Sequence, residues 1–394
     1  MSRYRLMPAP GQEIILLRHC ADARFVWNLG QEQRAMYRPG RGPTPGYYEQ
    51  KRQLTEARAA EPWLAEGSVT VQQEALRDLD QAWKNFFNGT HRRPTWRKAT
   101  DHNGFRIVGP QASRVEQVNR RWSQVLVPKV GWVRFRRSRP VPDAKSYRVT
   151  RDRAGRWHIA FATIPEPVPG PHTGEVVGVD RGVTVSAALS TGELLTCPQL
   201  RVTEQARLLR LERKSARQRI RGRKPSGRLK RTYTAIAKLK AREADIRKDW
   251  AEKTSTDLAR RFDVIRIEDL QICNMTRSAS GTLAEPGRNV RQKAGLNRGI
   301  LASGWGLLAR RLEHKAGERV QKVRPAYTSM TCNACGHCET RNRKSQAFLC
   351  LACGHRDHAD INAAKNIAAG HAVTARGGRG KLSRPVNREP LVAA

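Results

Sequence analysis

The chain reads Cys332-Asn333-Ala334-Cys335 near its C-terminus, then Cys350-Leu351-Ala352-Cys353, and then Asp360-Ile361-Asn362-Ala363-Ala364-Lys365-Asn366-Ile367. Two Cys-x-x-Cys pairs separated by a short polar loop can place four thiolates around one Zn²⁺. An isolated acid that opens an alanine-rich helix beside them has the chemistry of a catalytic metal ligand. The block therefore predicts two different metals, a structural zinc on the four cysteines and a hard cation at Asp360.

Other residues near the cysteine pairs offer alternative zinc ligands. His337 and His355 could each replace a cysteine, and Cys338 is an extra thiol. Because the spacing of two Cys-x-x-Cys pairs is a strong zinc signal, the all-cysteine site is the preferred prediction. Five of the eight cysteines fall between residues 332 and 353, a distribution that suits zinc in a reducing compartment better than a disulfide framework.

The net charge of the chain indicates which class of molecule it binds. The chain has 394 residues with 74 Lys and Arg against 35 Asp and Glu, a formal net charge of +39, and its sequence pI is about 11.1. A polyphosphate partner such as a nucleic acid explains this excess of positive charge. The alternative explanation is that the chain is merely soluble and rich in arginine. No apolar run approaches the ~20 residues that span a bilayer. We therefore expect a cytoplasmic nucleic-acid-binding protein without membrane contact.

The first 164 residues predict a binding module. A possible strand at Tyr4–Leu6 precedes helical spacing up to Trp27, and the Pro/Gly-rich stretch Tyr37–Tyr47 breaks the pattern. Helical spacing returns over 48–87, where an apolar stripe predicts core packing. The stripe consists of Val71, Ala75, Leu76, Leu79, Ala82 and Phe86.

Strand-like runs then fill residues 103–164, separated by Gly and Pro. Arginine alternates with apolar residues in them, which predicts one buried and one basic face. The runs are 105–108, 124–128, 133–135, 147–150 and 157–162. The prediction for residues 1–164 is a β-barrel with an inserted helical part.

After a proline-rich linker at 165–171 the pattern becomes α/β. Val176–Asp180 is a short apolar strand that ends in an acid, and two further short runs up to Leu195 complete a three-strand meander. Phe262–Leu270 contains a second apolar strand, which ends at Glu268. The α/β part therefore contains two strands with carboxylates at their C-terminal ends.

Residues 203–260 predict two long helices broken at Gly222–Gly227. Between Arg207 and Lys248 there are 17 basic and 3 acidic residues. One interpretation is a solvated helical hairpin. The other is a basic wall against a nucleic-acid backbone, which the local charge asymmetry favours. The basic residues at the break would make these backbone contacts: Arg217, Arg219, Arg221, Arg223 and Lys224.

Three acids are candidate catalytic residues: Asp180 and Glu268 at strand ends, and Asp360 at the start of the late helix. Carboxylates from separate segments can hold two Mg²⁺ ions, which activate a water and stabilise the leaving oxygen of a phosphodiester. A lone acid after a strand is more often a turn residue or a helix cap. The joint arrangement is what favours catalysis. Asp269 and Asp357 are competitors, although strand alternation directs Asp269 to the face opposite Glu268.

The motifs of this chain, in this order, resemble those of the TnpB family, transposon-encoded RNA-guided endonucleases related to the type V CRISPR effectors. The resemblance spans nearly the whole chain. It is carried by Gly178-Val179-Asp180-Arg181-Gly182, Ile267-Glu268-Asp269-Leu270, Tyr327-Thr328-Ser329-Met330-Thr331-Cys332 with the second cysteine pair, Asp360-Ile361-Asn362-Ala363-Ala364, Tyr4-Arg5-Leu6, Arg24-Phe25-Val26-Trp27-Asn28, and Ala294-Gly295-Leu296-Asn297 with Trp305.

The resemblance implies a fold of class α/β plus β-barrel. It comprises an RNase H-like (RuvC) nuclease domain with an inserted zinc ribbon, preceded by an oligonucleotide-binding-like (OB-like) wedge barrel with a helical recognition insertion. The implied boundaries are 1–35 and 101–168 for the wedge, 36–100 for the insertion, 174–327 and 358–370 for the nuclease with its hairpin at 203–260, 328–357 for the ribbon, and 371–394 for a disordered basic tail.

The resemblance also implies the activity and the partners. It assigns Asp180, Glu268 and Asp360 as the catalytic Mg²⁺ ligands and Cys332, Cys335, Cys350 and Cys353 as the zinc ligands. A guide RNA from the transposon end would direct cleavage of double-stranded DNA next to a short flanking motif, at the nucleoid of a prokaryotic cytoplasm. The alternatives are an RNA-guided DNA-binding regulator without cleavage and a transposase proper.

Arg181 departs from the pattern, since many members of the family carry an aliphatic residue after the first acid. Strand alternation directs its side chain away from Asp180. No loss of activity is therefore expected from this departure.

Overall fold

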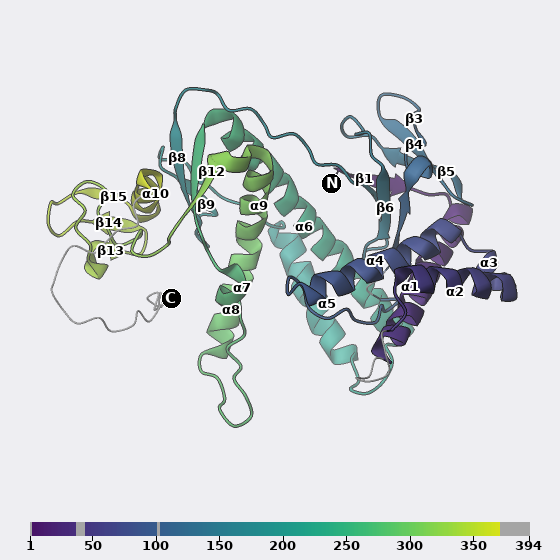
Figure 1. Cartoon of the computed structure of the whole chain (residues 1–394). Coiled ribbons are helices and arrows are strands. Elements are labelled where there is room, and N and C mark those ends of the chain that lie inside the picture. The colour runs from purple at the N-terminus through teal and green to yellow at the C-terminus, as the bar shows by residue number, and fades with distance from the viewer. Residues whose placement is uncertain (1, 37–43, 101–102, 371–394) are drawn as a thin grey trace. The chain divides into compact units, whose positions relative to one another are not determined.

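A computed structural model describes residues 2–36, 44–100 and 103–370 (Figure 1). It divides into two compact units. Unit 1 comprises Met1–Ile164 and Arg207–Ala241, and unit 2 comprises Pro165–Ala206 and Arg242–Ala394. Within the described ranges, no helix combines the length and the apolar character that a membrane span requires. The predicted basic tail at 371–394, and residues 37–43 of the predicted Pro/Gly break, lie outside the described residues.

Unit 1 is built on a seven-stranded antiparallel sheet. Its hydrogen-bonded order is β2-β6-β7-β1-β5-β4-β3, so the first strand of the chain lies in the middle of the sheet. The strands are β1 Ser2–Met7, β2 Gly104–Val108, β3 Val115–Gln117, β4 Trp122–Val127, β5 Gly131–Arg136, β6 Ser146–Arg151 and β7 Trp157–Phe161. Of these seven strands, β3 is the one that the sequence pattern does not predict, because this three-residue strand has no fully buried side chain.

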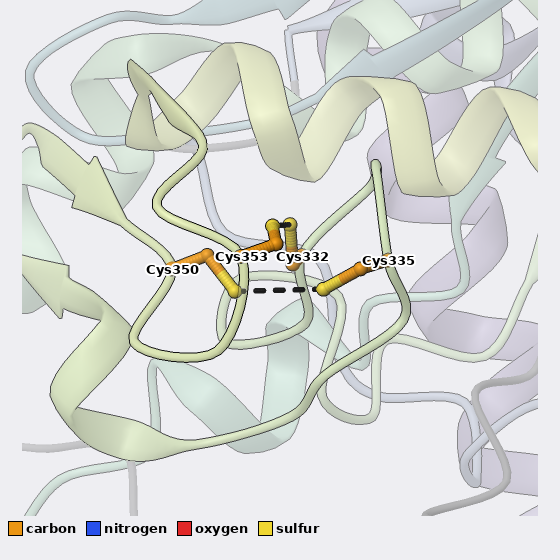
Figure 2. Close-up of side chains that lie close together, drawn as sticks. All are labelled: Cys332, Cys335, Cys350 and Cys353. Atoms are coloured by element: carbon orange, nitrogen blue, oxygen red, sulfur yellow. Dashed lines mark hydrogen bonds between the residues drawn. The ribbon is translucent and has the colours of Figure 1, made fainter.

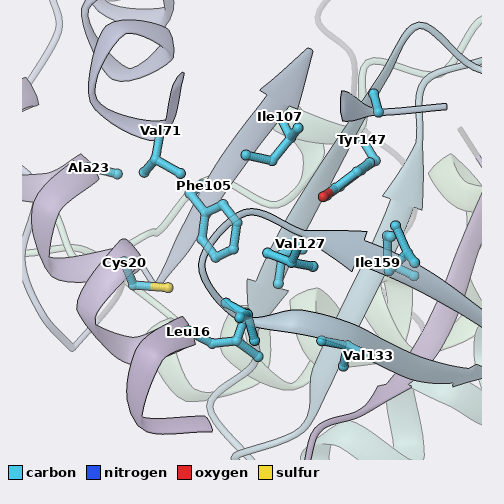
Figure 3. Packing of buried hydrophobic residues seen from close by; sticks show 14 of the residues in the cluster. Leu16, Cys20, Ala23, Val71, Phe105, Ile107, Val127, Val133, Tyr147 and Ile159 are labelled. Carbon is cyan, nitrogen blue, oxygen red and sulfur yellow. The ribbon is translucent and has the colours of Figure 1, made fainter. Parts of the chain in front are cut away.

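Side chains alternate between the two faces of this sheet, as the arginine-apolar pattern predicts. Figure 3 shows Phe105 and Val127 of the sheet on the side of Cys20 and Leu16 of the first helix, within one hydrophobic cluster. The sequence predicts a closed barrel. In the described residues the edge strands β2 and β3 pair with β6 and β4 but not with each other. Barrel closure by strand pairing is therefore not confirmed.

Helices pack against the sheet of unit 1. They are α1 Pro10–Ala35, α2 Tyr47–Ala60, α3 Pro62–Ala65 and α4 Val69–Phe87. The predicted stripe on α4 is confirmed as core. Val71, Ala75 and Leu76 join the main cluster, while Leu79 packs with Trp27 and Trp83 in a smaller cluster of its own.

The basic segment forms two helices, α5 Val202–Gln218 and α6 Gly227–Arg261, separated close to the predicted break. An ion pair between Lys240 and Glu212, at 2.8 Å, connects them. Helix α6 contributes its first part to unit 1 and its remainder to unit 2.

Unit 2 contains a mixed five-stranded sheet of order β10-β9-β8-β11-β12. The strands are β8 Val176–Asp180, β9 Ala187–Leu189, β10 Leu194–Leu195, β11 Val264–Glu268 and β12 Val320–Val323. β8 to β10 form the predicted antiparallel meander, and β11 is parallel to both β8 and β12. The helices are α7 Ile272–Met275, α8 Val290–Ser303, α9 Trp305–Ala316 and α10 Ala359–Ala369.

A small three-stranded sheet lies between β12 and α10 in the sequence. Its antiparallel strands are β13 Arg343–Lys344, β14 Ala347–Leu349 and β15 Arg356–His358. Phe348, Cys332, Cys350 and Ala359 form its core. A core of four residues is too small to hold a fold by burial alone, so this element requires another source of stability.

Candidate active site and metal centre

Two of the predicted acids end neighbouring parallel strands. β8 and β11 pair in a register that sets Val179 opposite Ile267. The next residue on each strand is an acid, Asp180 on β8 and Glu268 on β11. Because parallel strands end at the same edge of a sheet, this register brings the two carboxylates together at the carboxyl edge.

The third acid arrives on α10, which packs directly on β8. Gly178 permits this close approach, since a Cβ atom at this position would collide with the main chain of Ala364 and Ala368. Asp360 lies in the first turn of α10 and is buried. The side chain of His358 caps the helix by accepting a hydrogen bond of 3.2 Å from the Asp360 amide. The glycine of the strand and the alanines of the helix therefore position the acid.

The pKa of Asp180 reflects its burial and the charges of the other two acids. Burial raises the pKa of Asp180 well above its ordinary value, and the negative charges of Glu268 and Asp360 raise it further. Glu268 and Asp360 are themselves buried. Three carboxylates in one poorly solvated site repel each other, and a bound cation relieves that repulsion.

An ion pair and a hydrogen bond hold two of these acids, and the sequence pattern predicts neither contact. Nη2 of Arg343 on β13 lies 2.8 Å from Oδ1 of Asp360. The Thr328 hydroxyl donates to Oε1 of Glu268 at 3.0 Å. Among the described residues, only the cysteine group gathers three or more potential ligand atoms within 4.8 Å of one another. The acids are therefore electrostatically coupled but less tightly gathered than the thiols.

Arg181 takes a position that the sequence does not predict. It is buried, with 5% of its surface exposed, and its Nη2 donates to the main-chain oxygen of Glu268. Nε has no hydrogen-bond partner in the described part of the chain. Burial lowers the pKa of Arg181, while the charges of Glu268 and Asp180 oppose that effect. The side chain connects the end of β8 to the end of β11.

The two competing acids have other contacts. The Asp269 side chain is half exposed and lies 4.0 Å from Nζ of Lys322. Asp357 accepts a hydrogen bond of 2.7 Å from Nζ of Lys365. Glu268 and Asp360 are both buried, whereas Asp269 is half exposed and Asp357 is only partly buried, which favours Glu268 and Asp360 as the members of the site.

The four predicted zinc ligands converge. Figure 2 shows the thiols of Cys332, Cys335, Cys350 and Cys353 pointing toward one another. Sγ of Cys332 lies 3.8 Å from Sγ of Cys353, and Sγ of Cys335 lies 3.5 Å from Sγ of Cys350. These separations suit thiolates that share one tetrahedral ion.

Two equivalent turns present the thiols. Gly336 and Gly354 have φ angles of 75° and 73°, a region that favours glycine. Their amides donate to the carbonyl oxygens of Cys332 and Cys350 at 2.9 Å. Although burial opposes the change, amides of the second turn and thiol neighbours lower the pKa of Cys350 to about 6. In the first turn, although the His337 backbone contact opposes the change, burial and the neighbouring thiols raise the pKa of Cys335 to about 12. The second turn therefore favours a thiolate before the first does, and a zinc ion would favour the thiolate form of all four.

The alternative zinc ligands lie outside the group of thiols. His337 contacts Glu339 at 3.3 Å, and His355 lies 3.8 Å from Asp357. Cys338 is not a member of the group.

Two asparagines of the quoted motif connect the cysteine turns to α10. Asn362 donates to the main-chain oxygen of Thr331 at 2.7 Å and accepts from the Asn333 amide at 3.0 Å. Asn366, one turn later, donates to the oxygens of Thr328 and Thr331. The helix that carries Asp360 is thus fastened to the segment that carries the first cysteine.

The predicted backbone-contacting residues are all exposed. Arg217 lies at the end of α5, and the other four lie in the connection to α6. None of the five takes part in an ion pair with another described residue. The structure therefore leaves their charges available to solvent or to a partner.

Three segments of the chain match models of known protein families. Residues 305–367 match "Cas12f1-like, TNB domain", residues 146–279 match "Probable transposase", and residues 2–39 match "Helix-turn-helix domain". In the last region the structure contains β1 and the single long helix α1.

Related sequences extend over almost the full length. "Putative RNA-guided DNA endonuclease InsQ" of Escherichia coli (strain K12) is 36% identical over 98% of this chain and 96% of its own length. "Putative RNA-guided DNA endonuclease" of Streptomyces pristinaespiralis is 30% identical over 95% and 90%. A 55-residue segment is 51% identical to "CRISPR-associated endodeoxyribonuclease Cas12f1" of Sulfoacidibacillus thermotolerans, covering 14% of this chain and 13% of that protein.

Solved structures of similar shape include the Cas12f1-sgRNA-target DNA complex, with 14% identity, a TM-score of 0.46, and coverage of 91% of this chain and 83% of that one. CasPhi-2 (Cas12j) bound to crRNA has 13% identity and a TM-score of 0.43, with coverage of 93% and 97%.

Proposed function

This chain belongs to the TnpB family of transposon-encoded proteins, and from that premise we propose that it is an RNA-guided DNA endonuclease. The proposal is that a bound guide RNA selects double-stranded DNA by base pairing, and that the protein cleaves the DNA beside a short flanking motif. The observation that carries the proposal is that three acids from separate segments lie near one another, Asp180 and Glu268 at the ends of paired strands and Asp360 in the first turn of the helix packed on β8. Sequence identities of 36% and 30%, over 98% and 95% of this chain, to relatives named as putative RNA-guided DNA endonucleases support the proposal.

The three acids would hold the catalytic Mg²⁺ ions, which supply an activated water and a stabilised leaving oxygen for phosphodiester hydrolysis. Oxygen ligands suit this hard cation. Burial raises the pKa of Asp180, and the negative charges of Glu268 and Asp360, which a cation would neutralise, raise it further. Thr328 fixes the orientation of the Glu268 carboxylate, and Arg343 does the same for Asp360. The α/β sheet of unit 2 would then be the RuvC-like nuclease.

The cysteines would hold a structural Zn²⁺. Closed four-thiolate sites contribute folding energy rather than catalysis. The contacts of Asn362 and Asn366 with the segment before the first turn give this site an indirect role, because they fasten α10 and thus Asp360. Residues 328–357 would be the zinc ribbon within the nuclease.

Unit 1 would supply nucleic-acid binding. We assign its sheet as the OB-like wedge, residues 1–35 and 101–168, and its helices within 36–100 as the recognition insertion. The partners would be a guide RNA from the transposon end and the target DNA, which places the protein at the nucleoid of a prokaryotic cytoplasm. The tip of the α5–α6 hairpin would contact a phosphate backbone, because its charges are exposed.

Purification with its bound RNA tests the proposal. RNA that copurifies would be sequenced, transcribed, and added back to protein freed of nucleic acid. A plasmid library carrying the matching target beside randomised flanking bases would then be incubated with Mg²⁺ or with EDTA.

Cutting that requires the RNA, the matched target and Mg²⁺ is expected. Cleavage by protein without RNA would contradict guided cleavage. RNA-dependent binding of the target without cutting would favour the regulator instead. Joining of transposon ends to a target would favour a transposase proper.

A further inference from the structure

An irregular segment of unit 1 is held unusually firmly. Residues 88–98, here called the basic-aromatic loop, follow α4 and lie along α1. Trp27 Nε1 donates to the Thr95 oxygen at 3.0 Å, and Gln31 Nε2 donates to the Pro94 oxygen at 3.1 Å. Side chains of a helix therefore fix a loop that has no regular structure of its own.

Asn28 adds a two-way contact to the same loop. Its amide donates to the Arg97 oxygen at 3.1 Å, and its carbonyl oxygen accepts from the Arg97 amide at 2.8 Å. The Arg97 guanidinium lies 3.6 Å from the centre of the Trp27 ring. A loop fixed on a rigid helix is a common carrier of binding residues, since it presents them without an ordering cost.

The loop carries cations and one exposed aromatic ring. His91, Arg92 and Arg93 are exposed, and so is Trp96, with 46% of its surface accessible. This mixture of arginine and an aromatic ring is typical of surfaces that bind unpaired nucleotides, because arginine attracts phosphate and the ring stacks on a base.

A second exposed ring lies beside the loop at the end of α4. Phe87 is 72% exposed and stacks on Trp83 with ring centres 5.6 Å apart and an interplanar angle of 28°. Arg93 lies over the same Trp83 ring at 5.5 Å. Phe87 and Arg93 therefore flank one indole, which brings a stacking surface and a phosphate-binding cation together.

Core packing does not account for Phe87. The hydrophobic cluster at this end of the helices consists of Trp27, Leu79 and Trp83, with Phe86 packed against it. Phe87 is not part of that cluster and presents its ring to solvent. Single apolar side chains are common on protein surfaces, so it is the combination of this ring with the neighbouring exposed arginines that indicates a ligand.

We propose that the basic-aromatic loop and Phe87 bind unpaired nucleotides of the guide RNA, with Phe87 and Trp96 stacking on bases and Arg92 and Arg93 contacting phosphates. This site rests on the proposed function, since it requires a bound guide. RNA is favoured over a displaced DNA strand because the guide is the partner present before any target arrives. A site occupied in that resting complex keeps the exposed rings covered.

Affinity for the copurified RNA, transcribed and labelled, tests the site. Phe87→Leu keeps an apolar side chain but removes the ring, and it should weaken binding about ten-fold, as expected for loss of one base stack. Phe87→Trp should bind within about two-fold of the wild type. Because Phe87 is mostly exposed and loses only its contacts with Trp83 and Phe86, the melting temperature should fall slightly in Phe87→Leu and stay near that of the wild type in Phe87→Trp.

Leu283→Ala is the control, because Leu283 is a fully exposed apolar side chain of unit 2, outside the unit to which nucleic-acid binding is assigned. It should leave RNA affinity unchanged. Arg92→Gln with Arg93→Gln should weaken binding and reduce its salt dependence.

Three outcomes would overturn the assignment. Unchanged RNA affinity in Phe87→Leu, with normal guided cleavage, would remove the site while leaving the proposed function intact. Unchanged RNA affinity with weaker target binding by the RNA complex would assign the surface to DNA. Absence of any copurifying RNA would remove both the site and the guided mechanism.

Discussion

At the residue scale, the three acids should act as one unit. Asp180→Ala, Glu268→Ala and Asp360→Ala should each reduce guided plasmid cleavage to background, because metal ions shared by three ligands no longer bind once any one ligand is removed. RNA and target binding should remain, since phosphate contacts elsewhere supply the affinity. A double variant should be little less active than a single one.

Asp269→Ala and Asp357→Ala are the controls for this series. Both side chains pair with lysines, so their cleavage rates should stay near that of the wild type. Robust cutting by Asp360→Ala would exclude the assigned triad, and so would cutting that survives EDTA.

Arg181 provides a second prediction at this scale. Arg181→Leu should reduce the single-turnover cleavage rate about ten-fold, because it removes one of the two donors to the Glu268 main-chain oxygen, the other being the Leu270 amide, and so loses the contact between the ends of β8 and β11. Arg181→Lys should recover part of the rate. DNA affinity should not change.

The exposed Arg310, whose Nε donates within its own helix to the Gly306 oxygen, offers a matched control in Arg310→Leu. A wild-type rate in Arg181→Leu would show that this side chain only fills space.

The sequence predicts the acids but not what holds them. Asp180 and Glu268 are visible as acids at the ends of apolar strands, and Asp360 as an acid opening a helix. Arg343 and Thr328 reach them only through the folded path of the ribbon segment. No periodicity marks such contacts, because they depend on which segments pack together. The same holds for Arg181, since strand alternation predicts the face of the sheet to which its side chain points but not the residue that it contacts.

At the element scale, the ribbon should depend on its metal. One zinc ion per chain is expected, and Cys350→Ser should lose it, because four thiolates are needed to close the site. Residues 328–357 should then unfold locally. Cleavage should also fall, since Asn362 and Asn366 lose their ordered partners.

Cys338→Ser is the matched control and should keep its zinc, as Cys338 lies outside the ligand group. Metal analysis and hydrogen exchange measure both effects. A full equivalent of zinc in Cys350→Ser would show that the ligand assignment is wrong.

Strand β7 predicts a dependence of stability on pH. Burial, aided by the nearby Arg3 charge, lowers the pKa of His158 to about 4, against about 6.5 in an unfolded chain. The unfolded state therefore binds more protons between these two values, and stability falls as the pH drops from about 6.5 to 4. The decrease should approach about 3 kcal/mol, from ~1.4 kcal/mol for each pH unit of difference.

Melting temperatures at pH 7 and pH 4 measure this effect. His158→Gln should show a smaller difference between the two than the wild type, whereas the exposed His172→Gln should not. An equal difference in wild type and His158→Gln would mean that His158 is not the titrating group.

Sequence patterns do not predict several features of the fold. β12 is the third parallel strand, but Val320-Gln321-Lys322-Val323 has no fully buried side chain and so lacks the apolar signature of β8 and β11. The role of Gly178 cannot be predicted from its own strand, because it depends on α10 packing against that strand. By contrast, the meander β8 to β10 and the stripe on α4 follow from local alternation and helical spacing.

At the scale of the whole molecule, net charge is the property that the sequence gives most directly. The fold determines where on the molecule that charge lies. The excess of +39 is concentrated in part on the α5–α6 hairpin, where local acids are few. The ion pairs of Lys240 with Glu212 and of Arg242 with Glu204 use two of those acids within the helices. The tip between the helices keeps its positive charge.

The last prediction concerns that tip. Neutral replacement of Arg217, Arg219, Arg221, Arg223 and Lys224 should weaken binding to all nucleic-acid sequences while barely changing specificity. Each neutralised phosphate releases counterions, so the slope of log affinity against log salt should flatten by about 0.7–0.9 for each phosphate that the variant no longer neutralises. Exchange of the arginines for lysine is the control, since it keeps the charge and should keep the slope. An unchanged slope in the neutral variant would mean that these exposed cations only face solvent, and that the phosphate-binding residues lie elsewhere on the chain.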